Sequence, residues 1–131
     1  MSLFVARKTV KATEIATLMA VVRDVPIASH VERYAASVLL ASHPENPLAT
    51  EMIRKYGKYG ASPRGLQAMI LGAKVRALLD GRFNVSADDI QSVAAPALRH
   101  RILLNFEGEA EEISTDRIVQ EILEKTPVTA A

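Results

Sequence analysis

Apolar residues recur at the three- and four-residue spacing of an α-helix along most of the chain. Runs with this spacing predict helices over residues 13–23, 28–42, 63–79, 87–104 and 115–125. In the second run the apolar residues form one stripe, while Glu32 and Arg33 fall on the opposite side. The stripe consists of Ile27, Val31, Tyr34, Ala35, Val38 and Leu39. Stripes of this kind predict helices that pack against one another around a shared core.

Helix caps and helix breakers mark where these helices begin and end. Thr13 and Ser86 are suited to cap the helices that follow them, because their hydroxyls can accept a hydrogen bond from the first turn. Pro26 and Gly81 are suited to end the helices that precede them. Pro96 predicts a kink or a break within the fourth helix, which we expect to continue through "ALRHRILL".

Two stretches lack the helical spacing. Residues 41–60 contain two prolines and two glycines, and we expect a loop there with one helical turn near residues 50–54. We also expect the stretch "EGEAEEIS" to form a polar loop. The one candidate strand lies near residues 4–10. The pattern as a whole predicts an all-α fold, a small antiparallel bundle of four to five helices.

Composition adds a charge asymmetry to this picture. The 131 residues carry a net charge of +1, but residues 1–104 hold 14 Lys and Arg against 8 Asp and Glu, and residues 105–131 hold 2 against 7. This polarity indicates complementary ends in an assembly, an anion site in the basic part, or simply two ordinary solvated faces. The absence of cysteine excludes disulfides and thiolate metal sites, and it is typical of a cytoplasmic protein.

Several signatures of self-contained enzymes and of membrane proteins are missing from the sequence. It has no G-x-x-x-x-G-K-[ST] loop, no G-x-G-x-x-G and no G-x-S-x-G. The histidines, His30, His43 and His100, are too widely separated to predict a metal site. Asp88 and Asp89 are adjacent and so point to different sides of a helix, where capping explains them. Charged residues interrupt every run that could cross a membrane, so we expect no membrane contact.

An arginine stands where helix electrostatics favour an acid. Ser62 and Pro63 mark a helix start, so Arg64 lies in the first turn, at the positive end of the helix dipole. Unpaired N–H groups and a guanidinium together favour an anion, at a cost of roughly a few tenths of a kcal/mol in the free protein. The alternative is that Arg64 faces solvent or pairs with a nearby acid such as Asp89.

Neighbouring residues fit the anion site. Gly60 and Gly65 lack side-chain bulk on either side of Arg64, so we expect room for a ligand or another chain to approach. Lys55 and Lys58 lie shortly upstream and raise the local positive potential. Long loops such as the one that leads into Ser62 are often functional rather than passive connectors.

Five stretches carry a resemblance to a known family: "VRDVPIASHVERYAASVL", "GASPRG", "AKVRALLDGR", "VSADDI" and "PALRHRILL". From residue 11 to the closing "EILEKTPV", the chain resembles the C-terminal lid domain of MoxR-type AAA+ ATPases. The resemblance implies a helical lid over residues 11–131 and a tail or linker over residues 1–10. Walker A, Walker B, sensor 1 and the arginine finger of the family belong to a preceding α/β domain. Because "MSL" is typical of an artificial start, we expect a lid fragment rather than a natural orphan lid.

The resemblance also implies a role for the residues around "GASPRG". Arg64 matches the sensor-2 arginine, which contacts the terminal phosphates of ATP, in cis or on a neighbouring subunit. Ala61, Ser62, Pro63 and Gly65 are the nucleotide-binding residues that accompany it. The full-length protein would use ATP and Mg²⁺, whereas this fragment would bind neither and would be inactive alone.

The partners that the resemblance implies are the protein's own nucleotide-binding domain and neighbouring subunits of a hexameric ring. The implied activity is chaperone-like remodelling or maturation of a client protein, often one with a von Willebrand A-type domain. Arg99, His100 and Arg101 match the family's "LRHR" and would contact a neighbouring subunit or the loop before Arg64, or else form a basic helix end beside acids.

A rival interpretation is a free-standing helical adaptor that binds a protein through its basic face. Nucleic acid is a weaker candidate for that face, because the arginines are scattered, aromatic residues are few and no helix has the pattern of a recognition helix.

Overall fold

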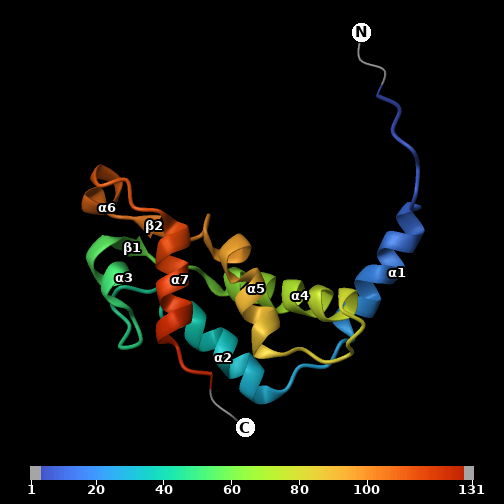
Figure 1. Cartoon of the computed structure of the whole chain (residues 1–131), viewed down its shortest axis with the longest axis horizontal. Helices are drawn as coiled ribbons and strands as arrows, with labels where there is room; N and C mark the ends of the chain where they lie inside the picture. Colours follow the sequence, from blue (N-terminus) through green and yellow to red (C-terminus); the bar gives the residue numbers. More distant parts are fainter. Residues whose placement is uncertain (1–3, 129–131) are drawn as a thin grey trace.

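The computed structural model describes residues 4–128, so the start "MSL" and the last three residues lie outside the described part. Seven helices and two short strands occur between residues 4 and 128. The helices are α1 (Ala12–Arg23), α2 (Ser29–Leu40), α3 (Glu51–Tyr56), α4 (Pro63–Leu79), α5 (Ala87–Leu98), α6 (Phe106–Ala110) and α7 (Thr115–Lys125), and the strands are β1 (Gly57–Tyr59) and β2 (Leu103–Leu104). The predicted all-α bundle is confirmed, with a small sheet added to it (Figure 1).

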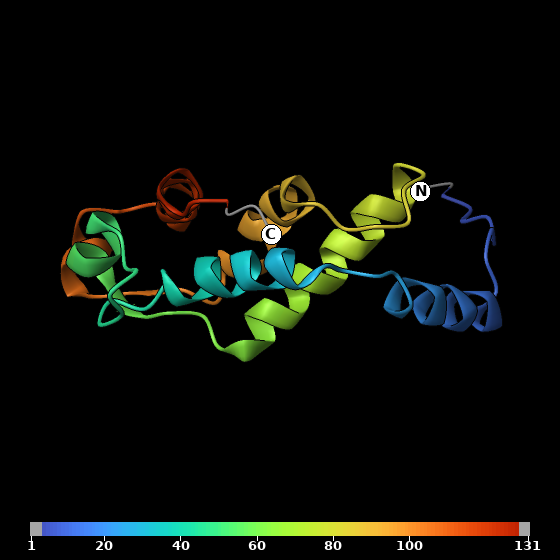
Figure 2. The ribbon, with the colours of Figure 1, turned by 90° about the horizontal axis from the view of Figure 1, so that it is seen from below.

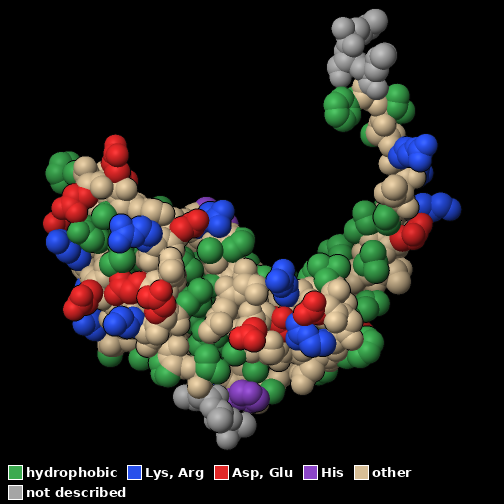
Figure 3. Space-filling view, viewed as in Figure 1, with side chains coloured by type: hydrophobic (Ala, Val, Ile, Leu, Met, Phe, Trp, Pro, Cys, Tyr) green, Lys and Arg blue, Asp and Glu red, His purple; other side chains and the backbone are tan. Residues whose placement is uncertain are grey.

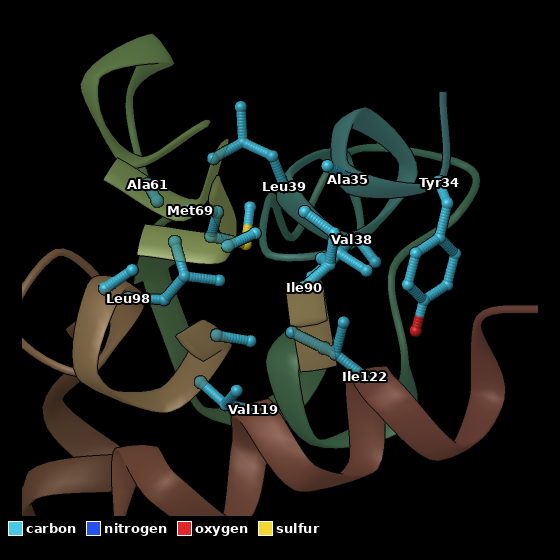
Figure 4. Close-up of a cluster of buried hydrophobic side chains, with 14 of the residues drawn as sticks. Tyr34, Ala35, Val38, Leu39, Ala61, Met69, Ile90, Leu98, Val119 and Ile122 are labelled. Atoms are coloured by element: carbon cyan, nitrogen blue, oxygen red, sulfur yellow. The ribbon is translucent and has the colours of Figure 1, made fainter. Parts of the chain in front are cut away.

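The core lies between α2, α4, α5 and α7, whose apolar side chains point into one cluster (Figure 4). The predicted stripe on α2 faces this core, since Val31, Tyr34, Ala35, Val38 and Leu39 are all buried. The facing helices contribute Met69, Ile90, Leu98, Ile118 and Ile122, each fully buried. Burying these side chains supplies most of the hydrophobic stabilisation of the bundle.

Helix α1 lies apart from this core, at the end of the molecule where α4 finishes (Figures 1 and 2). None of its residues is buried. The Nζ of Lys74 on α4 donates a hydrogen bond of 2.9 Å to the carbonyl oxygen of Arg23, which ties the end of α1 to α4. The expected cap at Thr13 is wrong, because the helix begins one residue earlier, after Lys11, and Thr13 already lies within its first turn.

Two predictions, the end of the fourth helix and the position of a strand, are wrong. Strands β1 and β2 pair in antiparallel fashion, with Gly57 opposite Leu104 and Tyr59 opposite Leu103. Helix α5 therefore ends at Leu98 and does not continue through "ALRHRILL", because Leu103 and Leu104 take extended conformations to pair with β1. Pro96 lies inside α5 close to this end. The strand expected near residues 4–10 is also wrong, since residues 4–10 are exposed and form no strand.

The acidic stretch expected to be a polar loop instead begins as the short helix α6. Asn105 caps it, with its Oδ1 accepting a 2.8 Å hydrogen bond from the N–H of Gly108. The Nδ2 of Asn105 donates to the carbonyl oxygen of Lys55, also at 2.8 Å, and so fastens α6 to α3. The helical turn expected near residues 50–54 is confirmed as α3, and residues 41–50 before it form turns.

The turn between α4 and α5 is fixed by a buried carboxylate. Gly81 ends α4 in the left-handed region, with a φ of 73°, as its position predicted. Two nitrogens of Arg82 donate hydrogen bonds of 2.6 and 2.8 Å to Asp89, whose side chain is 3% exposed. The expected cap at Ser86 is confirmed, with its backbone N–H donating to Asp89 and its hydroxyl accepting from the Asp89 N–H. Hydrogen bonds from Arg82, supported by those from Ser86 and opposed by burial, lower the pKa of Asp89 to about 2.

No helix between residues 4 and 128 is long and apolar enough to cross a membrane.

Candidate functional site

The start of α4 has the geometry that its sequence predicted. Ser62 occupies the capping position in an extended conformation, and Pro63 is the first helical residue. The N–H of Gly65 donates to the carbonyl oxygen of Ser62 at 2.8 Å and closes the first turn. Ser62, Pro63 and Arg64 are exposed, whereas Ala61 and Gly65 are buried. The exposed residues can therefore meet a ligand with their side chains, whereas the N–H groups of the two buried residues already donate within the chain.

Arg64 faces solvent, as the first of the two alternatives to an anion site expected. Among residues 4–128 it takes part in neither an ion pair nor a side-chain hydrogen bond, and the first turn of α4 contains no acidic residue. The alternative pairing with Asp89 is wrong, because Arg82 already occupies both oxygens of that carboxylate. An unpaired guanidinium at the positive end of a helix dipole is suited to bind an anion.

The room expected beside Gly60 and Gly65 is filled by other parts of the same chain. A side-chain carbon added at Gly60 would lie 2.5 Å from the carbonyl oxygen of Ser42. One added at Gly65 would lie 3.0 Å from Cδ2 of Leu98 and 3.3 Å from Cδ of Arg101. The expectation that these glycines admit a ligand is therefore wrong: they allow helix α4 and its leading segment to pack closely against the bundle.

The two upstream lysines are exposed and each lies over an aromatic ring. The Nζ of Lys55 is 5.2 Å from the centroid of the Tyr56 ring, and the Nζ of Lys58 is 5.3 Å from that of Tyr59. These contacts hold two positive charges on the surface of α3 and β1, just before the chain reaches α4.

Two residues that follow helix α2 hold the segment that precedes Arg64. The N–H of Ala61 donates to Oγ of Ser42 at 3.0 Å, and the carbonyl oxygen of Ala61 accepts from Nε2 of His43 at 2.8 Å. Sequence reasoning identified His43 only as a loop histidine and did not single out Ser42. No local signal could have linked them to Ala61, because 18 and 19 residues separate the partners.

The "LRHR" residues have separate environments. The Nε of Arg99 lies 3.0 Å from Oδ1 of Asp116 on α7, which confirms for Arg99 the interpretation as a basic helix end beside an acid. His100 is exposed. Arg101 folds back, with its Nε donating to the carbonyl oxygen of Ala97 at 3.0 Å, and its Cδ lies against Gly65. Arg101 thus contacts the first turn of α4, while contacts with a neighbouring subunit remain a prediction.

Comparison with known proteins identifies the family. The model of the AAA lid domain matches residues 49–122, which include Arg64 and the whole of α4 and α5. The chain belongs to the AAA lid domain family. This membership favours the lid over the free-standing adaptor.

The relatives of this lid are of the MoxR type. It is 31% identical over 91 residues to "Chaperone MoxR1" of Mycobacterium tuberculosis, covering 70% of this chain and 24% of that protein. It is 44% identical over 46 residues to "Protein MoxR" of Paracoccus denitrificans, covering 35% of this chain and 14% of that protein. The chain thus spans a quarter or less of the length of these relatives, and it is a lid domain of the MoxR-type AAA+ ATPases.

A solved structure agrees with this assignment. The crystal structure of a protein from Cytophaga hutchinsonii assigned as an ATPase matches the lid with a TM-score of 0.84 and 33% sequence identity. The match covers 90% of this chain and 36% of that protein. The structural similarity therefore extends over nearly all of the chain, beyond the residues that the family model matches.

Proposed function

We propose that this lid serves an ATP-hydrolysing AAA+ protein and that Arg64 is its sensor-2 arginine. The observation that carries the proposal is the position of Arg64: its guanidinium lies exposed in the first turn of the 17-residue helix α4 and has no hydrogen-bond or ion-pair partner among residues 4–128. A guanidinium at the positive end of a helix costs stability in the free lid, and an anion supplied from outside would offset that cost, which supports the proposal.

The chemistry proposed for Arg64 is stabilisation of charge. A guanidinium presents a rigid fork to the oxygens of the terminal phosphates, and it gains most when negative charge moves during phosphoryl transfer. Exposed Ser62 and Pro63 border the same phosphates. The N–H groups of Ala61 and Gly65 already donate to Oγ of Ser42 and to the carbonyl oxygen of Ser62, so these two buried residues act by shaping the backbone beside Arg64. Mg²⁺ would be held with ATP by the nucleotide-binding domain, since the described residues of the lid contain no cluster suited to a metal ion. Subunit-mixing experiments would distinguish an Arg64 that contacts the ATP of its own subunit from one that contacts a neighbour's.

The proposed partner of α1 is the nucleotide-binding domain of the same protein. The side chains of Ile15, Leu18 and Met19 are 50, 57 and 52% exposed, on a helix with no buried residue. Figure 3 shows apolar side chains gathered along α1 and where it approaches α4. A helix face with this many exposed apolar side chains is typical of a surface that packs against another domain. Residues 1–10, directly before α1, would then be the linker between the two domains.

The wider setting follows from the family. We propose a cytoplasmic ring, hexameric as in related AAA+ proteins, that remodels or matures a client protein such as one with a von Willebrand A-type domain. One relative carries the name "Chaperone MoxR1", which supports the chaperone-like part of this proposal.

The test is hydrolysis of Mg-ATP by the full-length protein with Arg64→Ala. We expect kcat to fall about a hundredfold, as for loss of one charge-stabilising donor, with an unchanged unfolding temperature. The matched control is Arg117→Ala, which removes another exposed arginine from the lid, on α7, and should leave kcat unchanged. Wild-type turnover in Arg64→Ala would refute the proposed role.

A further inference from the structure

The segment that leads into α4 rests on the end of α2. Ala61 is fully buried. At Gly60 the two backbones approach so closely that a side-chain carbon there would meet the carbonyl oxygen of Ser42 at 2.5 Å. Residues 60 and 61 therefore take their position from residues 42 and 43, which follow the last turn of α2.

Both backbone polar groups of Ala61 are held by neighbouring side chains in this region. Ser42 is fully buried, and its Oγ accepts from the Ala61 N–H at 3.0 Å while donating to the carbonyl oxygen of Leu39 at 2.6 Å. The Nε2 of His43 contacts the carbonyl oxygen of Ala61 at 2.8 Å. A residue fixed at both its N–H and its carbonyl has little freedom to rotate, so the direction in which the chain enters α4 is set here.

The hydrogen of the His43 contact lies on Nε2. A carbonyl oxygen only accepts hydrogen bonds, so Nε2 is the donor and this tautomer is set by the contact. The other ring nitrogen, Nδ1, lies 3.5 Å from Oε1 of Glu45. A glutamine side chain can place its N–H donor near the position of Nε2, whereas the shorter asparagine places it near Nδ1 and does not reach Ala61.

The first turn of α4 is fixed from the opposite side as well. Gly65 packs against Leu98 and the aliphatic part of Arg101. The backbone next to Arg64 is thus held by two sets of contacts, while the Arg64 side chain makes no hydrogen bond or ion pair among the described residues. The position of the guanidinium therefore depends on the contacts that fix the backbone of residues 61–65.

We propose that Ser42 and His43 are positioning residues for Arg64: through their hydrogen bonds to Ala61 they place the arginine against the phosphates. The proposal rests on the proposed function of Arg64 as a phosphate-contacting arginine. Small displacements of a charge-stabilising group are costly, because its contribution depends on distance and alignment to the reacting phosphoryl group.

The experiment compares His43→Asn and His43→Gln in the full-length protein, by steady-state hydrolysis of Mg-ATP. We expect kcat of His43→Asn to fall about tenfold, with KM changing much less, since the loss concerns the transition state. His43→Gln should retain most of the wild-type kcat, because it keeps the donor to Ala61. Ser42→Ala, which leaves the Ala61 N–H without its acceptor, should resemble His43→Asn.

A double variant links the effect to Arg64. In the Arg64→Ala background, His43→Asn should cause no further loss of kcat, because there is no guanidinium left to misplace. The matched control is Gln91→Ala, which removes the 3.1 Å hydrogen bond from Gln91 to the hydroxyl of Tyr34 and should keep the wild-type kcat. Thermal unfolding of each variant is followed in the same buffer, and hydrolysis is compared below the lowest transition.

The outcomes separate the two proposals. Wild-type turnover in Arg64→Ala refutes the role of Arg64 itself. A slow Arg64→Ala together with wild-type turnover in His43→Asn overturns only the positioning role. Equal losses in His43→Asn and His43→Gln, or additive losses in the double variant, overturn it too.

Discussion

Two arginines of this lid lie close to helix starts and have opposite environments. Arg82 is bound by Asp89 and Asp80, which raise its pKa, whereas Arg64 has no partner among residues 4–128. The sequence analysis placed Arg64 in the first turn of a helix but left open whether it faces solvent, binds an anion or pairs with an acid such as Asp89. Only the folded turn between α4 and α5 decides in favour of Arg82.

Removing the buried carboxylate should destabilise the lid. We expect Asp89→Ala to lower the free energy of unfolding by about 2–3 kcal/mol, because it removes a buried carboxylate that binds the partly exposed Arg82 and takes part in the capping box of α5. Urea unfolding of the isolated chain measures this. Asp88→Ala, at the exposed neighbouring position, should cost less than about 1 kcal/mol. Equal losses in the two variants would contradict this role of Asp89.

The same carboxylate predicts a loss of stability in acid. The pKa of Asp89 is lowered from 3.8 to about 2 on folding, so the unfolded chain binds a proton first as the pH falls. The stabilisation, about 2 kcal/mol, is present above pH 4 and disappears as the pH falls from about 4 to 2. Unfolding free energies measured at pH 5, 4 and 3 should show this decline in the wild type, and Asp89→Ala should lack that component of it.

Among the helices and strands, those marked by local sequence signals were predicted correctly, whereas those that depend on pairing with a distant segment were not. The stripe on α2, the starts of α4 and α5 and the end of α4 all follow from residues within one or two turns. The strand β2 does not, because its apolar residues also fit a helix and its partner β1 lies far upstream. Helix α6 is a different case, since its capping residue Asn105 was a local signal that could have been used.

Two glycines near or in α4 should respond in opposite ways to alanine. Gly60→Ala places a carbon 2.5 Å from the backbone of Ser42, so we expect a loss of about 1–3 kcal/mol from overpacking. At Gly72 the added carbon would lie 3.4 Å from Val93, an ordinary contact, and alanine should stabilise the helix by about 0.5–1 kcal/mol. Unfolding in urea measures both changes. A neutral Gly60→Ala would mean that the segment is not pressed against α2.

For the whole molecule, the main feature is the contrast between a packed bundle and the exposed helix α1 (Figure 2). The sequence predicted α1 and its apolar stripe, but periodicity does not say what covers a stripe. The hydrogen bonds of Ser42 and His43 to Ala61 could not be predicted from the sequence for a similar reason, because they depend on how α2 and α4 pack together.

The exposed face of α1 predicts a variant that affects only the complete protein. Leu18→Glu should change the free energy of unfolding of the isolated lid by less than about 0.5 kcal/mol, since Leu18 is 57% exposed there. In the full-length protein the same charge would be buried against the nucleotide-binding domain and should lower the unfolding temperature. Thr17→Glu, on the opposite side of α1, should lower neither. An unchanged full-length Leu18→Glu would show that α1 is not covered.

We propose that Arg64 completes a phosphate site from the lid side. The most direct measurement is kcat for Mg-ATP hydrolysis by full-length Arg64→Ala, with thermal unfolding followed on the same sample. We predict a loss of about a hundredfold with no change in unfolding temperature. Wild-type turnover would contradict the account, and a loss that only accompanies unfolding of the lid would contradict it as well.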